Sequence, residues 1–161
     1  MAGTDVKRSL FKTFINTTPL AAATYVLIGD GVKSGKIAMN PKLTDETYIS
    51  NDTATISVDS YAPKMAVAAK AKVGDAAFTY LDALRIARAV LGAAQTDIVN
   101  VWLYQTGGPT AYPAEKQTVS ISIEDFGGDG GTPVELAYTI NYAGDRTVGT
   151  FNSGTSAFTA S

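Results

Sequence analysis

The chain has 161 residues, 45% of them hydrophobic and only 17% charged, with a formal net charge of -2. The absence of cysteine and histidine excludes disulfide scaffolds, thiol catalysis, Cys/His zinc sites and every mechanism built on an imidazole base. The slightly acidic balance argues against a basic face that grips nucleic acid. The length suits one domain with a substantial core. The charged share, below the roughly 25% of an ordinary soluble domain, suggests burial of part of the surface in an oligomer.

The first apolar stretch, PLAAATYVLI (19–28), follows three basic residues and therefore resembles a signal peptide. However, it begins late, carries β-favouring residues and ends in a turn-like Gly29-Asp30-Gly31, so a strand over 24–28 is favoured. No stretch approaches the roughly 20 apolar residues of a membrane span, and we expect no membrane anchor.

The next segment, 29–53, is polar and punctuated by glycine, which predicts a long early inter-strand loop with at most short strand pieces near Tyr48 and Ile49. Loops of this length are usually functional or disordered. Its GVKSGK stretch (31–36) approaches a phosphate-binding loop. The spacing between its glycines is one residue too short, and Ile37 stands where a magnesium-binding Ser or Thr is needed. A flexible loop is the better interpretation.

Two strands are then expected, at 53–61 and 64–73. In the first, Ala54, Ile56 and Val58 alternate with polar residues and share one face.

The period then changes and predicts one α-helix over about 75–91, with Asp75 as N-cap and Gly92 just past its end. Asp82 and Arg85 are spaced to pair on its exposed side. An apolar stripe at helical spacing is formed by Ala77, Tyr80, Leu81, Leu84, Ala87 and Leu91. Ile86 and Val90 fall outside this stripe, so the helix is either deeply buried or covered on its back by a neighbour.

Four further strands are expected after the helix, at 97–105, 117–126, 133–144 and 146–152. The first is apolar on both faces, which indicates a central strand and a core position for Trp102. About seven strands and one helix predict a mainly β fold, an antiparallel β-sandwich or barrel with one flanking α-helix.

The stretch EDFGGDGGTP (124–133) suggests a phosphate cradle, a calcium loop or a turn. Calcium-binding β-rolls need stacked repeats and EF-hands need a longer acidic pattern, so calcium held by Glu124, Asp125 and Asp129 is a minor alternative. Because the stretch lies between two alternating strands, a glycine-rich hairpin turn is favoured.

Paired carboxylates are candidates for acid/base catalysis, as in glycosidases. The pairs Asp45/Glu46 and Glu124/Asp125 lie in polar runs that favour a solvated face, and no G-x-S-x-G nucleophile elbow is present. We therefore expect no enzyme, and no catalytic, cofactor-binding or metal-binding residues.

An ordered set of phrases covers nearly the whole chain: FKTFINT (11–17), NPKLTDETYISNDTATISVDSYAP (40–63), GDAAFTYLDALRIARAVLGAAQTDIVNVWLY (74–104) and AEKQTVSISIEDFGGDGGTPVELAYTINYAGDRTVGTF (114–151). Their order, spacing and total length resemble the major tail tube proteins of tailed bacteriophages, particularly those of phages and prophages of Gram-positive bacteria.

This resemblance implies a single tail-tube domain over 1–161, made of two packed antiparallel sheets with one helix on the flank. Six copies would form a ring, and stacked rings would form the tube that conducts DNA from capsid to host cell. The inter-ring loop would be about 29–53, the N-terminal arm about 1–18 and the C-terminal tail about 152–161.

The resemblance also implies a virion protein assembled in the host bacterial cytoplasm. Its partners would be further copies of itself, a tape measure protein inside the tube, and tail terminator and distal tail proteins at its ends. DNA would pass without specific binding. Ser120, Ser122, Thr139 and Asn141 fit a lumen or a solvent face equally well.

The alternative is an Ig-like β-sandwich that binds carbohydrate or a surface protein. A sugar-binding surface normally presents exposed aromatic residues, and the one tryptophan of this chain lies in its most hydrophobic strand.

Overall fold

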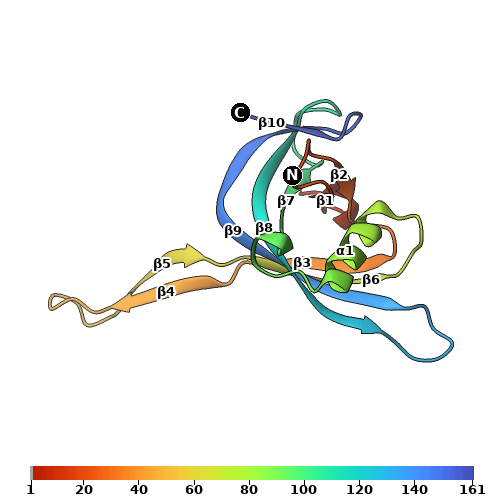
Figure 1. Cartoon of the computed structure of the whole chain (residues 1–161). Coiled ribbons are helices and arrows are strands. Elements are labelled where there is room, and N and C mark those ends of the chain that lie inside the picture. The colour runs from red at the N-terminus through yellow and green to blue at the C-terminus, as the bar shows by residue number, and fades with distance from the viewer. Residues whose placement is uncertain (1) are drawn as a thin grey trace.

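The computed structural model describes residues 2–161 and confirms a mainly β fold, with a single α-helix in that range (Figure 1). The strands are β1 (Phe11–Asn16), β2 (Tyr25–Leu27), β3 (Val32–Ala38), β4 (Pro41–Glu46), β5 (Thr55–Tyr61), β6 (Lys64–Lys70), β7 (Gln95–Trp102), β8 (Tyr112–Gly127), β9 (Glu135–Asn152) and β10 (Ala157–Ala160). The helix is α1 (Ala76–Ala87), and short 3-10 helices are η1 (Arg8–Leu10) and η2 (Leu91–Ala94).

One antiparallel sheet of 8 strands forms the body, in the order β2-β1-β7-β8-β9-β6-β3, with β10 paired to β9. β8 and β9 are 16 and 18 residues long and run through both halves of the sheet as curved ribbons (Figure 1). The expectation of two separate packed sheets is therefore wrong in this detail, because these long strands join both halves into one curled half-barrel.

The pairing of β8 with β9 shifts register near the middle of β9. Lys116 pairs with Thr147 but Thr118 pairs with Ala143, so three residues of β9 lie opposite one of β8. Such bulges bend a strand and increase its twist. The strands predicted at 133–144 and 146–152 are thus one bent strand. Its polar middle resembled a turn in the sequence, yet it stays hydrogen-bonded within the sheet.

Helix α1 begins where the sequence predicts, with the Asp75 carboxylate accepting a hydrogen bond of 3.3 Å from the Phe78 amide. The predicted ion pair between Asp82 and Arg85 is also confirmed, at 2.8 Å. The helix ends four residues earlier than expected. Arg88 takes the left-handed conformation that closes it, and Gly92 lies in η2 instead.

The main core lies between α1 and the sheet. Its fully buried members are Ile15, Met65, Val67, Ala69, Ala77, Leu81, Ile98, Val119, Ile121, Leu136, Tyr138 and Ile140. A smaller cluster on the opposite face of β7 contains Val99, Val101, Ala114 and Phe151. Because β7 contributes to both clusters, its prediction as a central strand is confirmed. Trp102, at its end opposite Phe11, is only half-buried.

Both ends of the chain are more ordered than the sequence suggested. The predicted N-terminal arm of 1–18 contains β1, a sheet strand with Thr13, Ile15 and Asn16 buried; only residues 2–10 precede the sheet, and Met1 lies outside the described residues. The predicted tail of 152–161 turns back as β10 and pairs with β9.

Candidate assembly interface

The most prominent surface feature is a two-stranded arm, formed by β4, β5 and their connection (residues 41–61), that projects away from the body (Figure 1). Every residue of the arm is exposed except Thr44. The arm replaces most of the predicted loop of 29–53, while the preceding GVKSGK stretch belongs largely to β3. The expected strand near Tyr48 and Ile49 is absent, because these residues lie at the tip connection.

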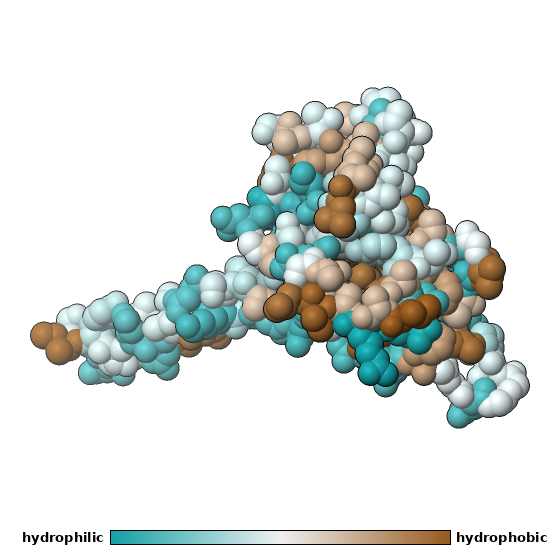
Figure 2. Space-filling model, viewed as in Figure 1, coloured by the Kyte–Doolittle hydropathy of each residue, from teal (hydrophilic) through white to brown (hydrophobic). Residues whose placement is uncertain are grey.

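The arm presents apolar side chains to solvent. Leu43 pairs with Val58 across it, and Ile56 lies on the same face; these side chains are 52–66% exposed. The predicted alternation in 53–61 is thus confirmed, but its apolar face covers no core. At the tip, Ile49 is fully exposed, where Figure 2 shows hydrophobic atoms at the far end of the arm. An isolated two-stranded hairpin is at best marginally stable in water, so this arm is suited to contact another chain.

Several strand edges of the body are unpaired within residues 2–161. β3 pairs only with β6, and β2 only with β1. β7 pairs with β8 no further than Ser120, which leaves the far half of β8 without a neighbour on that side. Unpaired edges are templates for pairing with other chains, and natural proteins cover them.

Exposed apolar residues also collect where α1 ends. Ile86, Val90 and Leu91 are 68–86% exposed. Val90 and Leu91 line an open groove between the end of the helix and the unpaired half of β8. Phe126 also lines it, and the Arg85 guanidinium lies over the Phe126 ring, 3.8 Å from the ring centroid. Of the two explanations for the wide apolar arc of the helix, deep burial is therefore wrong, and these side chains remain uncovered in the isolated chain.

The sheet face opposite the helix carries small, uncharged side chains along β8 and β9. Ser120 pairs with Asn141 and Ser122 with Thr139, and the Asn141 amide donates to Ser122 Oγ at 3.2 Å. On the neighbouring β6, Ala66 continues this face opposite Thr139. The result is a polar surface of short neutral side chains in the middle of the sheet, bordered by Lys64 opposite Asn141 and by Lys36 opposite Ala66.

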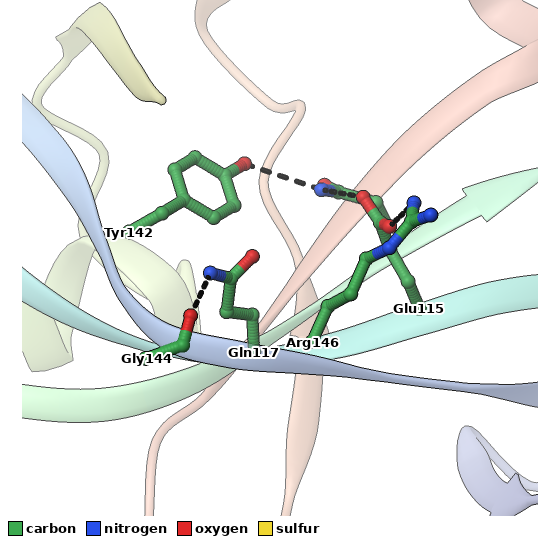
Figure 3. A network of polar contacts seen from close by, with 6 residues as sticks. Glu115, Gln117, Tyr142, Gly144 and Arg146 are labelled. Atoms are coloured by element: carbon green, nitrogen blue, oxygen red, sulfur yellow. Dashed lines mark hydrogen bonds and ion pairs between the residues drawn. The ribbon is translucent and has the colours of Figure 1, made fainter. Parts of the chain in front are cut away.

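A polar network crosses the bend between β8 and β9 (Figure 3). The buried Asn100 amide donates to the Tyr142 hydroxyl at 3.2 Å, and its carbonyl accepts from Thr13 Oγ1 at 2.9 Å. Glu115, its side chain only 14% exposed, pairs with Arg146 at 2.8 Å. These contacts tie β1 and β7 to both long strands at the point where the sheet bends.

Burial raises the pKa of Tyr142 to about 12, more than the hydrogen bond from Asn100 lowers it, with a further increase from the negative charge of Glu115. Burial likewise raises the pKa of Tyr138. Both tyrosines stay neutral at any physiological pH, and Tyr142 serves as a structural hydrogen-bond acceptor for Asn100.

The acidic residues singled out in the sequence form no common site. Asp45 and Glu46 are neighbours on the exposed arm, and Glu124 accepts a hydrogen bond of 2.9 Å from Ser122. Within residues 2–161, no group of three or more acidic side chains is placed to hold a metal ion. Over the same range, no helix has the length and apolar character needed to cross a membrane.

The glycine-rich stretch 124–133 completes β8 and forms most of the hairpin connection to β9, so the predicted hairpin turn is confirmed. The last pair is Gly127 with Glu135, and both Gly127 and Gly128 have positive φ, of 135° and 147°. Such angles suit glycine far better than other residues. The backbone conformation therefore accounts for these glycines, and no bound ligand is needed to explain them.

No family model and no curated protein matches the sequence. The structure, however, is similar to solved ones. A chain from the tail of an empty GTA particle with C6 symmetry has a TM-score of 0.63 at 12% identity, with 97% of this chain and 100% of that one covered. A chain of the SPP1 tail tube, determined by solid-state NMR and cryo-EM, has a TM-score of 0.70 at 15% identity, with 92% and 81% covered.

This chain has the tail-tube fold. At these identities the similarity establishes the fold and its extent over nearly the whole chain. The fold places the arm, the open strand edges and the uncovered helix end on the outside of one compact body.

The sequence predicts two of these features only in part. The segment that contains β4 has the polar, glycine-punctuated composition of a loop, which conceals its strand. The alternation of residues in β5 predicts a strand, but the sequence does not identify β4 as the strand that pairs with it. The uncovered helix end was visible in Ile86 and Val90, but a sequence alone does not say which chain covers them.

Proposed function

We propose that this chain is a structural virion protein whose copies form hexameric rings that stack into a phage tail tube, which conducts DNA from the capsid to the host cell. The observation that carries this proposal is the match over at least 92% of the chain to subunits of assembled tails, one of them with C6 symmetry. No catalytic step is part of the proposed role.

Ring formation accounts for the unpaired edges of the body. A sheet whose outer strands are β2 and β3 exposes backbone donors and acceptors on both sides. When copies pair edge to edge around a closed ring, every such edge is covered and no free template remains. The apolar residues at the end of α1 would be covered by the neighbouring copy in the same ring.

The small-residue face of β8 and β9 is our candidate for the tube lumen. Ser120, Ser122, Thr139 and Asn141 project no charge and no long side chain. Proteins that hold DNA do so mainly by neutralising phosphates with Lys and Arg. The short neutral groups in the middle of this face would not hold DNA, and the cations on it are confined to β3 and β6, at Lys36 and Lys64.

The arm is our candidate for the contact between stacked rings, in place of the wider loop of 29–53. Residues 2–10 before β1 and the terminal β10 segment are further candidates for contacts between subunits. In this role the protein would be assembled in the host bacterial cytoplasm. It would surround a tape measure protein and meet tail terminator and distal tail proteins at the tube ends.

Negative-stain electron microscopy of the purified protein tests the proposal. We expect six-fold rings or hollow tubes, with formation favoured at high protein concentration. A stable monomer at high concentration would count against the tube. It would favour the alternative of an Ig-like binding module for carbohydrate or a surface protein.

A second experiment replaces the whole arm, residues 41–61, by two glycines. Asn40 and Ala62 already lie side by side, since the Asn40 side-chain amide donates to the Ala62 carbonyl at 3.0 Å. We expect the body to fold, as judged by circular dichroism and Trp102 fluorescence, while long tubes disappear. Ser57→Ala, which removes one hydroxyl from the exposed arm, is the matched control. Tubes of normal length from the armless variant would exclude the arm from ring stacking.

A further inference from the structure

The arm is acidic along its outer part. Between Lys42 and Lys64 the chain has no lysine or arginine, but it carries Asp45, Glu46, Asp52 and Asp59. None of these carboxylates forms an ion pair within residues 2–161. The arm therefore combines unneutralised negative charge with a fully exposed apolar residue, Ile49, at its tip.

A basic groove lies elsewhere on the body, between β1, the end of β2 and the start of β3. Its volume is about 340 Å³, and its lining includes Arg8, Phe11, Lys12, Leu27, Lys33 and Gly35. Three of these residues are cationic and none is acidic. The Leu27 side chain in its wall is 38% exposed, so the groove also offers an apolar contact.

The cations of this groove are not neutralised by the chain itself. The Arg8 guanidinium donates to backbone carbonyls, including that of Gly35 at 3.1 Å, and lies over the Phe11 ring. Neither Lys12 nor Lys33 forms an ion pair with any residue of the range 2–161. The groove thus holds fixed positive charge that is complementary to the arm.

The arm and the groove lie at opposite ends of one strand. The arm continues outward from Ala38, where β3 ends, whereas the groove lies against the first residues of β3, Val32 to Gly35. At about 3.4 Å per residue, β4 from Pro41 to Glu46 extends roughly 17 Å, and the tip connection with Ile49 lies beyond its end. The arm therefore cannot fold back into its own groove while it continues the direction of β3.

We propose that the arm of one copy docks in this basic groove of a second copy. Its carboxylates lie against Arg8, Lys12 and Lys33, and Ile49 contacts the apolar wall. The contact is head-to-tail, which generates an open, repeating assembly and not a closed pair. The inference rests on the proposed tube and adds to it the receiving site on the next ring.

Charge reversal tests the docking directly. The groove variant is Lys12→Glu with Lys33→Glu, and the arm variant is Asp45→Lys with Glu46→Lys. Like charges placed face to face lower affinity on the order of a hundredfold, so each variant alone loses long tubes. The two sets combined in one chain restore opposite charges at every contact and with them the tubes. Lys64→Glu, an exposed cation outside both the arm and the groove, is the control and retains tubes.

A cross-link locates the contact, because the chain has no native cysteine. Ile49→Cys combined with Ser34→Cys gives a ladder of disulfide-linked copies on oxidation, visible without reductant. Ile49→Cys combined with Thr132→Cys, in the hairpin turn between β8 and β9, is the control and gives no ladder. A ladder from the control pair, or none from the groove pair in assembled tubes, would overturn the proposed site.

The failures are distinguishable. If the unmodified protein forms neither rings nor tubes, the proposed function and this inference fall together. If it forms tubes and both charge-reversed variants form them at normal length, only the docking is wrong. A mobility shift with duplex DNA covers the other occupant: DNA binding that is lost with Lys12→Glu and Lys33→Glu, while tubes stay normal, would make the groove a nucleic-acid site.

Discussion

Leu81 offers a direct test of how α1 is held on the sheet. Its side chain is 2% exposed, and Leu81 and Ala77 are the two residues of the helix that are buried against the sheet. Leu81→Ala leaves a cavity between helix and sheet. Changes of this kind lower the free energy of unfolding by about 2 to 5 kcal/mol. For a chain of this length each kcal/mol lowers the melting temperature by about 2 to 4 °C.

The measurement is urea unfolding of the unassembled monomer, followed by Trp102 fluorescence and circular dichroism, with light scattering to confirm that no tubes are present. The matched control is Ile86→Ala on the same helix, where the side chain is 68% exposed. A surface change of that kind shifts stability by within about 0.5 kcal/mol. If Ile86 is an assembly contact, the control also forms fewer tubes despite its unchanged stability.

Equal losses of stability for Leu81→Ala and Ile86→Ala would refute the reasoning, because they would show that α1 does not rest on the sheet through Leu81. A loss below about 1 kcal/mol for Leu81→Ala would mean that the site collapses around the smaller side chain and leaves little cavity.

Three further predictions concern the cap, the buried tyrosine and the last strand. Asp75→Ala removes the N-cap of α1 and should cost about 0.5 to 2 kcal/mol in urea unfolding, whereas Asp75→Ser should restore most of it. Tyr142 keeps its proton up to a pH of about 12, above the ordinary tyrosine pKa of 10.0. Its stabilising effect is therefore complete below pH 10.0 and is lost as pH rises toward 12, and ultraviolet titration of Tyr142→Phe should lack one late-ionising phenol. Gly149→Ala places a Cβ in collision with the Thr159 carbonyl oxygen, so β10 should detach and its amides exchange rapidly, while Thr159→Ala should leave them protected.

The fold class could be predicted from the sequence because the main signals come from residues close together in the chain. Alternation in 117–126 and the cap at Asp75 each depend on neighbours within a few residues, and both predictions were confirmed. The bend in β9 was not readable, because whether residues such as Gly144 turn the chain or bulge within a sheet depends on the partner strand β8. The division into two sheets failed for the same reason.

The surfaces proposed for assembly could be predicted from the sequence only in part. A polar stretch such as 40–54 has the composition of a loop, and its strand character comes from pairing with β5. The helical pattern correctly places the exposed apolar residues Ile86 and Val90 outside the main apolar stripe of the helix. Their environment depends on other copies of the chain, about which one sequence carries no local signal.

The central position of the long hairpin has a consequence for the order of folding. β8 and β9 are joined by a short turn, so their pairing costs little loop-closure entropy, whereas Ile15 of β1 pairs with Ile98 more than eighty residues later. We expect the hairpin to form early and β1 to join late. Because β8 and β9 follow β1 to β7 in the chain, the first strands cannot pair into the sheet until the hairpin has been synthesised. The body therefore forms, and presents its edges to another copy, only after β9 has left the ribosome.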